Sequence, residues 1–522
     1  PQAALPTQQA APATDAAPRP NKARADSPEP STPDPAAAPE APRTATAAPV
    51  EIPDAAEPLD VELAPVSSDA FVATGTEAAT WLEGAPRDVV EAVAVNLDTT
   101  PEELDERFTD DTTAFLSADG MAGYIEPTPD QEHADAHGDD HDAHGDAGAT
   151  DEPTPTEANG SIDVFALHSL PSSTKVIYLD FDGHQMEDEY WNSAYSIGPY
   201  TNQPYDIDDD PTTFSDTERA RILEIWQLVA DDYAPFDIDV TTEDPGIDGL
   251  RRSNPTDTAF GTRTVITSSD WFAAANNGRR IGGIALLNVF TSGTDHASYV
   301  FSSNLGNGHA KYVADAASHE AGHTFSLTHD DTTGSDYYGG HGSWGPIMGS
   351  PYRRAVTQWS NGQYPTATNS EDDLDKIAAR GGVLADDHAG TTADATTVSE
   401  GAHTGVIGVG GDIDTFRITP AGGDTAITVT SPAPATNLVA KLTVRDDVGD
   451  VVTEIDPDTA SGWSLDTVVP ASTGTFTVEV SGTSWLTPAD GFVAYGSLGA
   501  YTLTVDALPG SSTTTSTTSA PT

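Results

Sequence analysis

Three stretches of this chain carry too few large apolar side chains to form a hydrophobic core, and they divide its 522 residues into separate folding units. Residues 1–66 are mainly Ala, Pro, Thr and Asp, residues 128–160 are acidic and polar, and residues 509–522 are rich in Ser and Thr. Such compositions cannot bury enough apolar surface to offset the entropy lost on folding. We therefore expect a disordered N-terminal segment, an acidic linker and a disordered tail, with folded units between them.

The charge of the chain limits its partners. Its 83 acidic and 22 basic residues give a net charge of −61, which argues against binding to nucleic acid or to an anionic membrane surface. No apolar run approaches the roughly 18 to 20 residues that span a bilayer, so we expect no membrane insertion. With no cysteine there is neither a disulfide nor a thiolate metal site. The sequence does not indicate the oligomeric state.

Residues 67–127 predict a small helical N-terminal unit. Apolar spacing typical of helices runs over 78–97 and 101–108, and a short strand-like run follows at 121–124. The linker 128–160 contains four histidines among Asp and Gly residues, and these could bind transition metals, although a solvated tract is the more common outcome. They are His133, His137, His141 and His144.

The fold class predicted for the rest of the chain is α+β, followed by an all-β sandwich. In residues 161–386 an amphipathic helix at 215–233, with Ser215 and Glu218 as a capping box, lies among apolar runs typical of a mixed twisted sheet. The runs are 176–181, 236–240, 263–267, 283–289 and 298–301. In residues 387–508 short Val/Thr-rich runs separated by Gly, Pro and Asp are typical of an antiparallel sandwich. Its predicted strands are 414–418, 426–429, 438–444, 476–480 and 500–505.

The segment His319-Glu-Ala-Gly-His-Thr-Phe-Ser-Leu-Thr-His329 carries the chemistry. On a helix His319 and His323 project from the same face, so both imidazoles can bind one Zn²⁺ ion. Glu320 lies beside them and can take a proton from water that zinc activates. His329 lies beyond the helical face, so the chain must turn to bring it back as the third ligand.

This motif resembles that of the metzincin zinc peptidases, and most closely the bacterial adamalysin/reprolysin-like branch. Ser326 stands where the family has a glycine that permits a left-handed turn, and a serine there would cost about 1 to 2 kcal/mol. The run Gly345-Pro-Ile-Met-Gly349 resembles the family's methionine turn, with Met348 beneath the metal. Asp330 resembles the structural aspartate that follows the third ligand.

The resemblance implies an extended peptide substrate bound along an edge strand, for which 283–289 is the candidate. It also implies a tyrosine that assists the oxyanion. Tyr352 is favoured over Tyr337 and Tyr338, although packing is the commoner role of each. His341 is interpreted as a surface residue.

Residues 387–508 resemble a bacterial pre-peptidase C-terminal (PPC) domain, through Asp412-Ile-Asp-Thr-Phe416, the run at 475–480 and the run at 496–504. Such domains accompany secreted proteases.

The sequence therefore predicts a secreted zinc endopeptidase whose signal peptide has been removed, since the chain begins at Pro1. The alternative is a catalytically weak or inactive metzincin-fold protein that binds a surface or matrix. Residues 67–127 are also a candidate prosegment; without cysteine, a blocking group would be an Asp or His ligand, or the block would be steric. Residues 206–210 suit calcium in their oxygen ligands, and a solvated acidic loop is the alternative.

Overall fold

The computed structural model describes residues 73–117, 120–129, 162–431, 437–457 and 463–508. Helices and strands are mixed in it, with several sheets, and residues 396–507 are rich in strands, which agrees with the predicted α+β class and β-rich C-terminal unit. The predictions for residues 1–66 and 509–522, and for the four linker histidines, lie outside the described residues. None of the described helices has the length and apolar character needed to cross a membrane.

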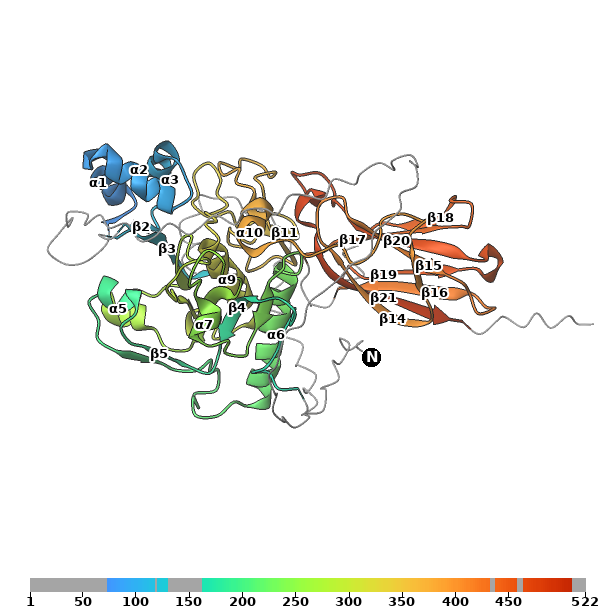
Figure 1. Ribbon diagram of the computed structural model, residues 1–522, viewed down its shortest axis with the longest axis horizontal. Coiled ribbons are helices and arrows are strands. Elements are labelled where there is room, and N and C mark those ends of the chain that lie inside the picture. The colour runs from blue at the N-terminus through green and yellow to red at the C-terminus, as the bar shows by residue number, and fades with distance from the viewer. Residues whose placement is uncertain (1–72, 118–119, 130–161, 432–436, 458–462, 509–522) are drawn as a thin grey trace, which may run out of the picture. The chain divides into compact units, whose positions relative to one another are not determined.

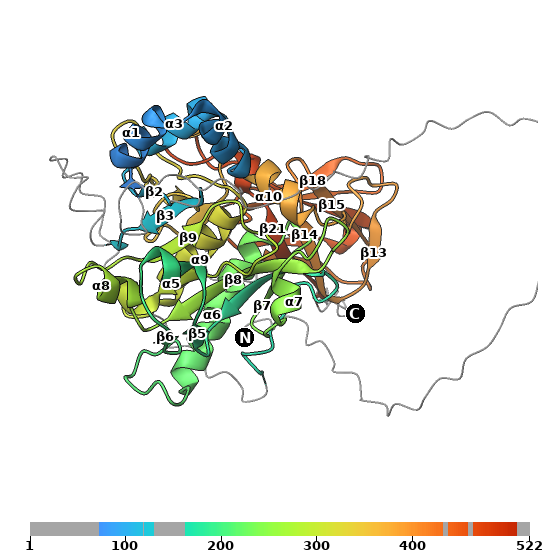
Figure 2. The same cartoon turned by 60° about the vertical axis from the view of Figure 1, so that its left-hand side comes forward.

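An eight-stranded sheet positions the candidate site. Its strand order is β1-β2-β3-β9-β10-β8-β4-β7. The pairs β7–β4, β4–β8 and β8–β10 are parallel. The pairs β10–β9, β9–β3, β3–β2 and β2–β1 are antiparallel. Figure 2 shows β3 beside β9. The bounds are β1 Ala73–Thr74, β2 Ala114–Leu116, β3 Ala122–Glu126, β4 Lys175–Asp180, β7 Asp239–Thr241, β8 Phe260–Thr267, β9 Gly283–Leu286 and β10 Ser298–Phe301.

The predicted strands of this sheet are confirmed at β4, β8, β9 and β10, with two differences at the ends. The run predicted over 283–289 stops at Leu286 because Asn288 has a φ of 57° and turns the chain. The run predicted over 236–240 becomes a strand only at Asp239, since the amide of Phe236 bonds back to Tyr233 in a turn after the preceding helix. β4 is buried along Val176–Leu179, as its unbroken apolar run predicts.

Two helices pack together against the sheet. α6 (Asp216–Asp232) begins with the predicted capping box, in which Ser215 accepts from the amide of Glu218 and Glu218 accepts from the amide of Ser215. α9 (Ala310–Thr324) lies against α6, and their facing side chains share one apolar core. This core includes Ile222, Ile225 and Val229 from α6 and Val313, Ala317 and Ala321 from α9. It fixes the helix that carries His319 and His323.

The remaining described elements around this sheet are short. They are the helices α5 (Tyr190–Ala194), α7 (Ile247–Leu250), α8 (Trp271–Ala275) and α10 (Asp373–Gly381), the hairpin β5 (His184–Met186) with β6 (Tyr200–Asn202), and the parallel pair β11 (Trp344–Pro346) with β12 (Val356–Gln358).

The N-terminal unit contains more than the predicted helices. α1 (Thr76–Gly84), α2 (Arg87–Asn96) and α3 (Pro101–Asp110) share a small core, and the helix predicted over 78–97 is two helices because Pro86 interrupts it. The strand expected at 121–124 is β3, and together with β1 and β2 it extends the eight-stranded sheet beyond β9. The unit therefore contains the predicted helices and strand, and in addition β1 and β2, which the sequence did not indicate.

Residues 396–507 form two sheets with a shared apolar core (Figure 1). The five predicted strands are confirmed, and the four that the sequence did not reveal have more exposed side chains. One sheet has the order β13-β15-β20-β17-β18 and the other β14-β21-β16-β19. The bounds are β13 Thr396–Val398, β14 Gly401–Ile407, β15 Ile413–Ile418, β16 Thr425–Thr430, β17 Ala440–Arg445, β18 Val451–Ile455, β19 Leu465–Val469, β20 Phe476–Gly482 and β21 Gly499–Ala507.

A buried carboxyl at the end of α6 connects three parts of the structure. Asp232 accepts a hydrogen bond from the hydroxyl of Ser318 on α9. It accepts a second from Nδ2 of Asn437 at 2.6 Å. Burial raises the pKa of Asp232 to about 8. A folded-state pKa above the unfolded value means that the folded protein binds more protons, so this carboxyl lowers the free energy of unfolding as pH rises from about 4 to about 8.

We predict that Asp232→Asn makes stability less dependent on pH, because an amide cannot ionise. The free energy of unfolding of the variant relative to the parent should rise between pH 5 and pH 8.5, with a slope of at most about 1.4 kcal/mol per pH unit. Scanning calorimetry at several pH values measures this, with the exposed Asp447→Asn as control. A difference between variant and parent that stays constant with pH would contradict the assignment.

Candidate metal centre

The structure brings the three histidines predicted as ligands into one buried cluster. α9 carries His319 and His323 on one face, and their ring centroids lie 4.7 Å apart. After the helix ends at Thr324 the chain reverses and returns His329, whose ring centroid lies 5.1 Å from that of His323 and 5.3 Å from that of His319. All three side chains are buried.

Ser326 makes this reversal in a left-handed conformation that glycine adopts most readily. Its φ is 72°, in the left-handed region, and it is fully buried. Two hydrogen bonds hold the turn despite the strain: the Ser326 hydroxyl donates to the carbonyl of Leu97 at 2.8 Å, and Nζ of Lys376 donates to the Ser326 carbonyl at 3.0 Å. The serine is therefore compatible with the return of the third histidine.

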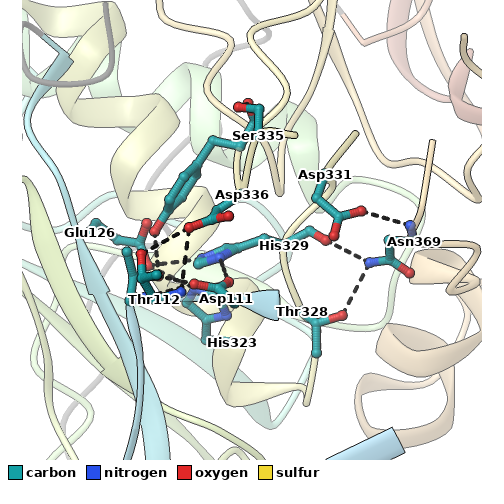
Figure 3. Close-up of polar contacts among 12 residues, drawn as sticks. Asp111, Thr112, Glu126, His323, Thr328, His329, Asp331, Ser335, Asp336 and Asn369 are labelled. Atoms are coloured by element: carbon teal, nitrogen blue, oxygen red, sulfur yellow. Dashed lines mark hydrogen bonds and ion pairs between the residues drawn. The ribbon is translucent and has the colours of Figure 1, made fainter. Parts of the chain in front are cut away.

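The outer nitrogen of each imidazole has an oxygen partner. His319 Nδ1 donates to the carbonyl of Ile347 at 2.9 Å and His323 Nδ1 to that of Leu327 at 2.8 Å. Since a carbonyl only accepts, both rings carry a proton on Nδ1 and can present an Nε2 lone pair. The third ring bonds a carboxylate instead, with His329 Nδ1 lying 2.5 Å from Oδ2 of Asp111 (Figure 3).

A fourth group lies among the three Nε2 atoms, namely the carboxylate of Glu126 at the end of β3. Its oxygens lie 3.3 Å from Nε2 of His323 and 3.0 Å from that of His329 (Figure 3). They also lie 3.5 Å from Nε2 of His319. Where an imidazole is neutral, its Nε2 lone pair and the carboxylate are both acceptors, so either a bound cation or a proton on Nε2 must lie between them. Three imidazoles and one carboxylate form a donor set that fits Zn²⁺.

The pKa values of these groups follow from burial and from their mutual charges. Burial lowers the pKa of His323 to about 4. Burial also opposes protonation of His329, but the charges of Glu126 and Asp111 outweigh it and raise the pKa of His329 to about 10. Although burial opposes ionisation of Glu126, the imidazoles of His329 and His319 hold its pKa well below the usual range. The cluster thus keeps its carboxylate ionised and retains positive charge beside it.

Glu320 lies beside this cluster with its carboxylate unused. It is fully buried, and neither of its oxygens has a hydrogen-bond partner among the described residues. Burial, together with the charge of Glu126, raises the pKa of Glu320 well above its usual range. Gly283 at the start of β9 makes room for it, since a Cβ there would lie 1.8 Å from Oε1 of Glu320. A buried carboxylate without a partner costs stability, which is typical of a functional group.

Met348 lies directly beneath the helix, as predicted. A Cβ on Gly322, between the two helical histidines, would lie 2.6 Å from Sδ of Met348, which is fully buried. The amide of Asp330 donates to the Met348 carbonyl at 2.8 Å, so the residue after His329 is tied to this floor. The carboxylate of Asp330 accepts from the hydroxyl of Tyr364 at 3.2 Å, so it bonds within the fold.

Two tyrosine rings pack on either side of the third imidazole. The ring centroid of Tyr124 lies 4.0 Å from that of His329, and the ring centroid of Tyr337 lies 4.2 Å from it. Tyr352, which was favoured on sequence, packs against Tyr312, and its hydroxyl lies 3.7 Å from where a Cβ on Gly282 would stand. Of the three tyrosines named on sequence, Tyr337 is thus the one whose ring packs on His329.

The other residues singled out on sequence have partners of their own. Tyr338 stacks on Tyr364 and its hydroxyl lies 2.6 Å from Nδ1 of His341, whose Nε2 donates to the carbonyl of Gly491 at 2.7 Å. Both therefore serve packing. Carboxylates of Asp206, Asp208 and Glu218 lie close together, but they already accept hydrogen bonds from nearby backbone amides.

Sequence reasoning missed Glu126, Asp111 and Asn369, because each reaches the site through the fold. Asn369 donates to the His329 carbonyl at 2.7 Å and accordingly steadies the third ligand (Figure 3). Glu126 is separated from His323 by 197 residues and from His329 by 203. The one usable signal was the spacing of Tyr124 and Glu126, which places both side chains on the same face of a strand.

Comparison with known proteins does not identify a family. No family model matches the chain, and no curated protein matches it. The solved pre-peptidase C-terminal domain of collagenase from Bacillus anthracis is 16% identical, covering 22% of this chain and 94% of that chain with a TM-score of 0.16. PliG, a periplasmic inhibitor of g-type lysozyme from Aeromonas hydrophila, is 16% identical, covering 22% of this chain and 96% of that chain with a TM-score of 0.16. PliG from Salmonella Typhimurium is 15% identical, covering 21% of this chain and 96% of that chain with a TM-score of 0.14. Likenesses at these TM-scores carry no argument about function.

We predict that Gly322→Ala destabilises the protein by about 1 to 3 kcal/mol, because the new methyl group would overlap Sδ of Met348. Combining it with Met348→Ala should cost less than the sum of the two single changes, since the shortened side chain makes room. Chemical denaturation measures both. Gly84→Ala on α1 is the control, because its Cβ would meet nothing within 4 Å. Strict additivity of the two changes would show that Met348 does not support the ligand helix.

Proposed function

We propose that the protein is a zinc-dependent endopeptidase of the metzincin type, with His319, His323 and His329 as metal ligands and Glu320 as general base. The observation that carries the proposal is the buried carboxylate of Glu320, which has no hydrogen-bond partner among the described residues and lies next to three convergent imidazoles. When bound, zinc supplies Lewis acidity and lowers the pKa of water toward neutrality.

Each side chain then has a defined task. Glu320 accepts a proton from the attacking water and returns it to the leaving amine, which suits a buried carboxylate that has no hydrogen-bond partner among the described residues. The Nδ1 bonds of His319 and His323 to backbone carbonyls fix the orientation of the ligand rings. The hydroxyl of Tyr337, whose ring packs on His329, is the candidate donor to the developing oxyanion.

The substrate class follows from the sheet edge above the metal centre. β9 lies over Glu320, and its edge accepts an added antiparallel strand, as its pairing with β3 demonstrates. An extended peptide bound there gains main-chain hydrogen bonds whatever its sequence. Once β3 has left it, an edge of this kind suits cleavage at internal peptide bonds. The secreted location and the accessory role of residues 387–508 rest on the sequence resemblance.

Glu126 supports a second candidate function. A zinc ion held by four protein side chains has no open position, which is typical of structural sites. If Glu126 never leaves the cluster, the domain is a non-catalytic scaffold and the protein binds a surface or matrix. The two functions differ in whether peptide bonds are cleaved once Glu126 has been removed from the centre.

We predict that Glu320→Gln lowers peptide cleavage by about 10²- to 10⁴-fold while zinc content stays near one per chain. Casein hydrolysis and zinc content should be measured on cut protein. The cut is made at a specific protease site inserted after Gly148, and the N-terminal fragment is then washed away. The exposed Glu187→Gln is the control. Unchanged cleavage by the Glu320→Gln variant with zinc bound would show that Glu320 is not the base.

A further inference from the structure

The strand β3 occupies the edge of β9 that the proposed function assigns to substrate. The two strands pair antiparallel from Gly123 opposite Leu286 to Glu126 opposite Gly283. The fit is close, because a Cβ on Gly123 would lie 2.0 Å from the carbonyl oxygen of Ala285 and 2.7 Å from the ring of Phe115. While β3 is paired here, no peptide can add to β9.

Alternate side chains of β3 point into the metal centre. Tyr124 and Glu126 lie two residues apart and therefore on one face of the strand. The Tyr124 ring stacks on His323 with centroids 4.6 Å apart, and the Glu126 carboxylate lies among the three Nε2 atoms. The strand thus covers the imidazoles and also supplies a fourth group that could bind a metal with them.

Other residues of the N-terminal unit contact the same site from a second side. Asp111 bonds His329, and the hydroxyl of Thr113 lies 2.9 Å from that of Tyr337, the candidate oxyanion donor. Thr112 donates to Asp336 at 2.9 Å (Figure 3). The N-terminal unit thus contacts the candidate ligand His329, the candidate catalytic group Tyr337 and the neighbouring loop residue Asp336.

A third set of contacts holds the turn after α2. The Leu97 carbonyl accepts from the hydroxyl of Ser326, and the Asn96 carbonyl accepts from Nδ2 of Asn288 at 2.7 Å. Arg380 pairs with Asp98 at 2.8 Å. Ser326 stands where a glycine would suffice for the turn. Among the described residues, the bond to the Leu97 carbonyl is the one hydrogen bond that its hydroxyl makes.

We infer that residues 73–129 are an intramolecular inhibitor that keeps the proposed peptidase latent. Glu126 takes the open metal position, β3 takes the place of substrate, and Ser326 is a latch that recognises the inhibitor. The inference rests on the proposed function. It explains why an otherwise costly serine occupies the left-handed turn, and it supplies a carboxylate block in a chain that has no cysteine.

The test compares the cut protein described above with the uncut chain, both loaded with Co²⁺. Two readouts are the visible absorption of the cobalt centre and the binding of a fluorescein-labelled peptide hydroxamate. Cutting and removing the N-terminal fragment should tighten hydroxamate binding by at least 100-fold. In the uncut chain Glu126→Ala should change the cobalt spectrum and tighten binding by about tenfold, whereas the exposed Glu77→Ala on α1 should do neither.

Ser326→Ala provides a separate arm, because it keeps the Cβ and removes only the hydroxyl. In the uncut chain it should tighten hydroxamate binding severalfold and increase hydrogen exchange along β9, and in the cut protein it should change neither. Equal effects in both forms would mean that Ser326 has only a structural role and would overturn the latch.

The outcomes separate the inference from the proposed function. Equal hydroxamate binding by the cut and uncut proteins would overturn the inhibitor assignment, and a cobalt spectrum unaffected by Glu126→Ala would overturn the role of Glu126 as ligand. Tight binding by the cut protein without any casein cleavage would uphold the block and refute the peptidase. If the Glu126→Ala variant does not fold, Gly123→Val tests the same release, since it displaces β3 without changing the identity of any of the four candidate ligands.

Discussion

The structure depends on the burial of one carboxylate among three imidazoles. Glu126, His319, His323 and His329 are withdrawn from water in one cluster, and their lone pairs face each other. Such an arrangement is stable only with positive charge between the groups. Much of the neighbouring structure serves this cluster: backbone carbonyls orient two rings, Asn369 and Asp330 fix the return of the third, and Met348 closes the floor.

A single sheet edge connects inhibition with the proposed activity. β9 lies over Glu320 because Gly283 has no side chain, and its outer edge pairs with β3. The main-chain groups that would hold a substrate therefore also hold the inhibitory strand, and the two compete for the same hydrogen bonds. A strand that belongs to the same chain has a high effective concentration, so it would outcompete a free peptide until the connection is cut.

The sequence predicted the parts of the site whose geometry is local. The spacing of His319 and His323 on one helix and the core strand at Lys175–Asp180 follow from short-range rules, and the structure has both. The left-handed turn at Ser326 was expected from the family resemblance, and the structure has it too. Glu126 could not be predicted, because its position depends on strand pairing between segments separated by about 200 residues. The favoured Tyr352 shows the same limit, since proximity in sequence did not place it against the histidines, where Tyr337 lies.

The most direct test is zinc anomalous diffraction from crystals of the uncut protein. The account predicts one strong peak within bonding distance of the Nε2 atoms of His319, His323 and His329 and of the Glu126 carboxylate. Data collected below the zinc absorption edge should lose that peak, which identifies the metal. A zinc peak elsewhere in the chain, or a fourth ligand at this centre other than Glu126, would contradict the account.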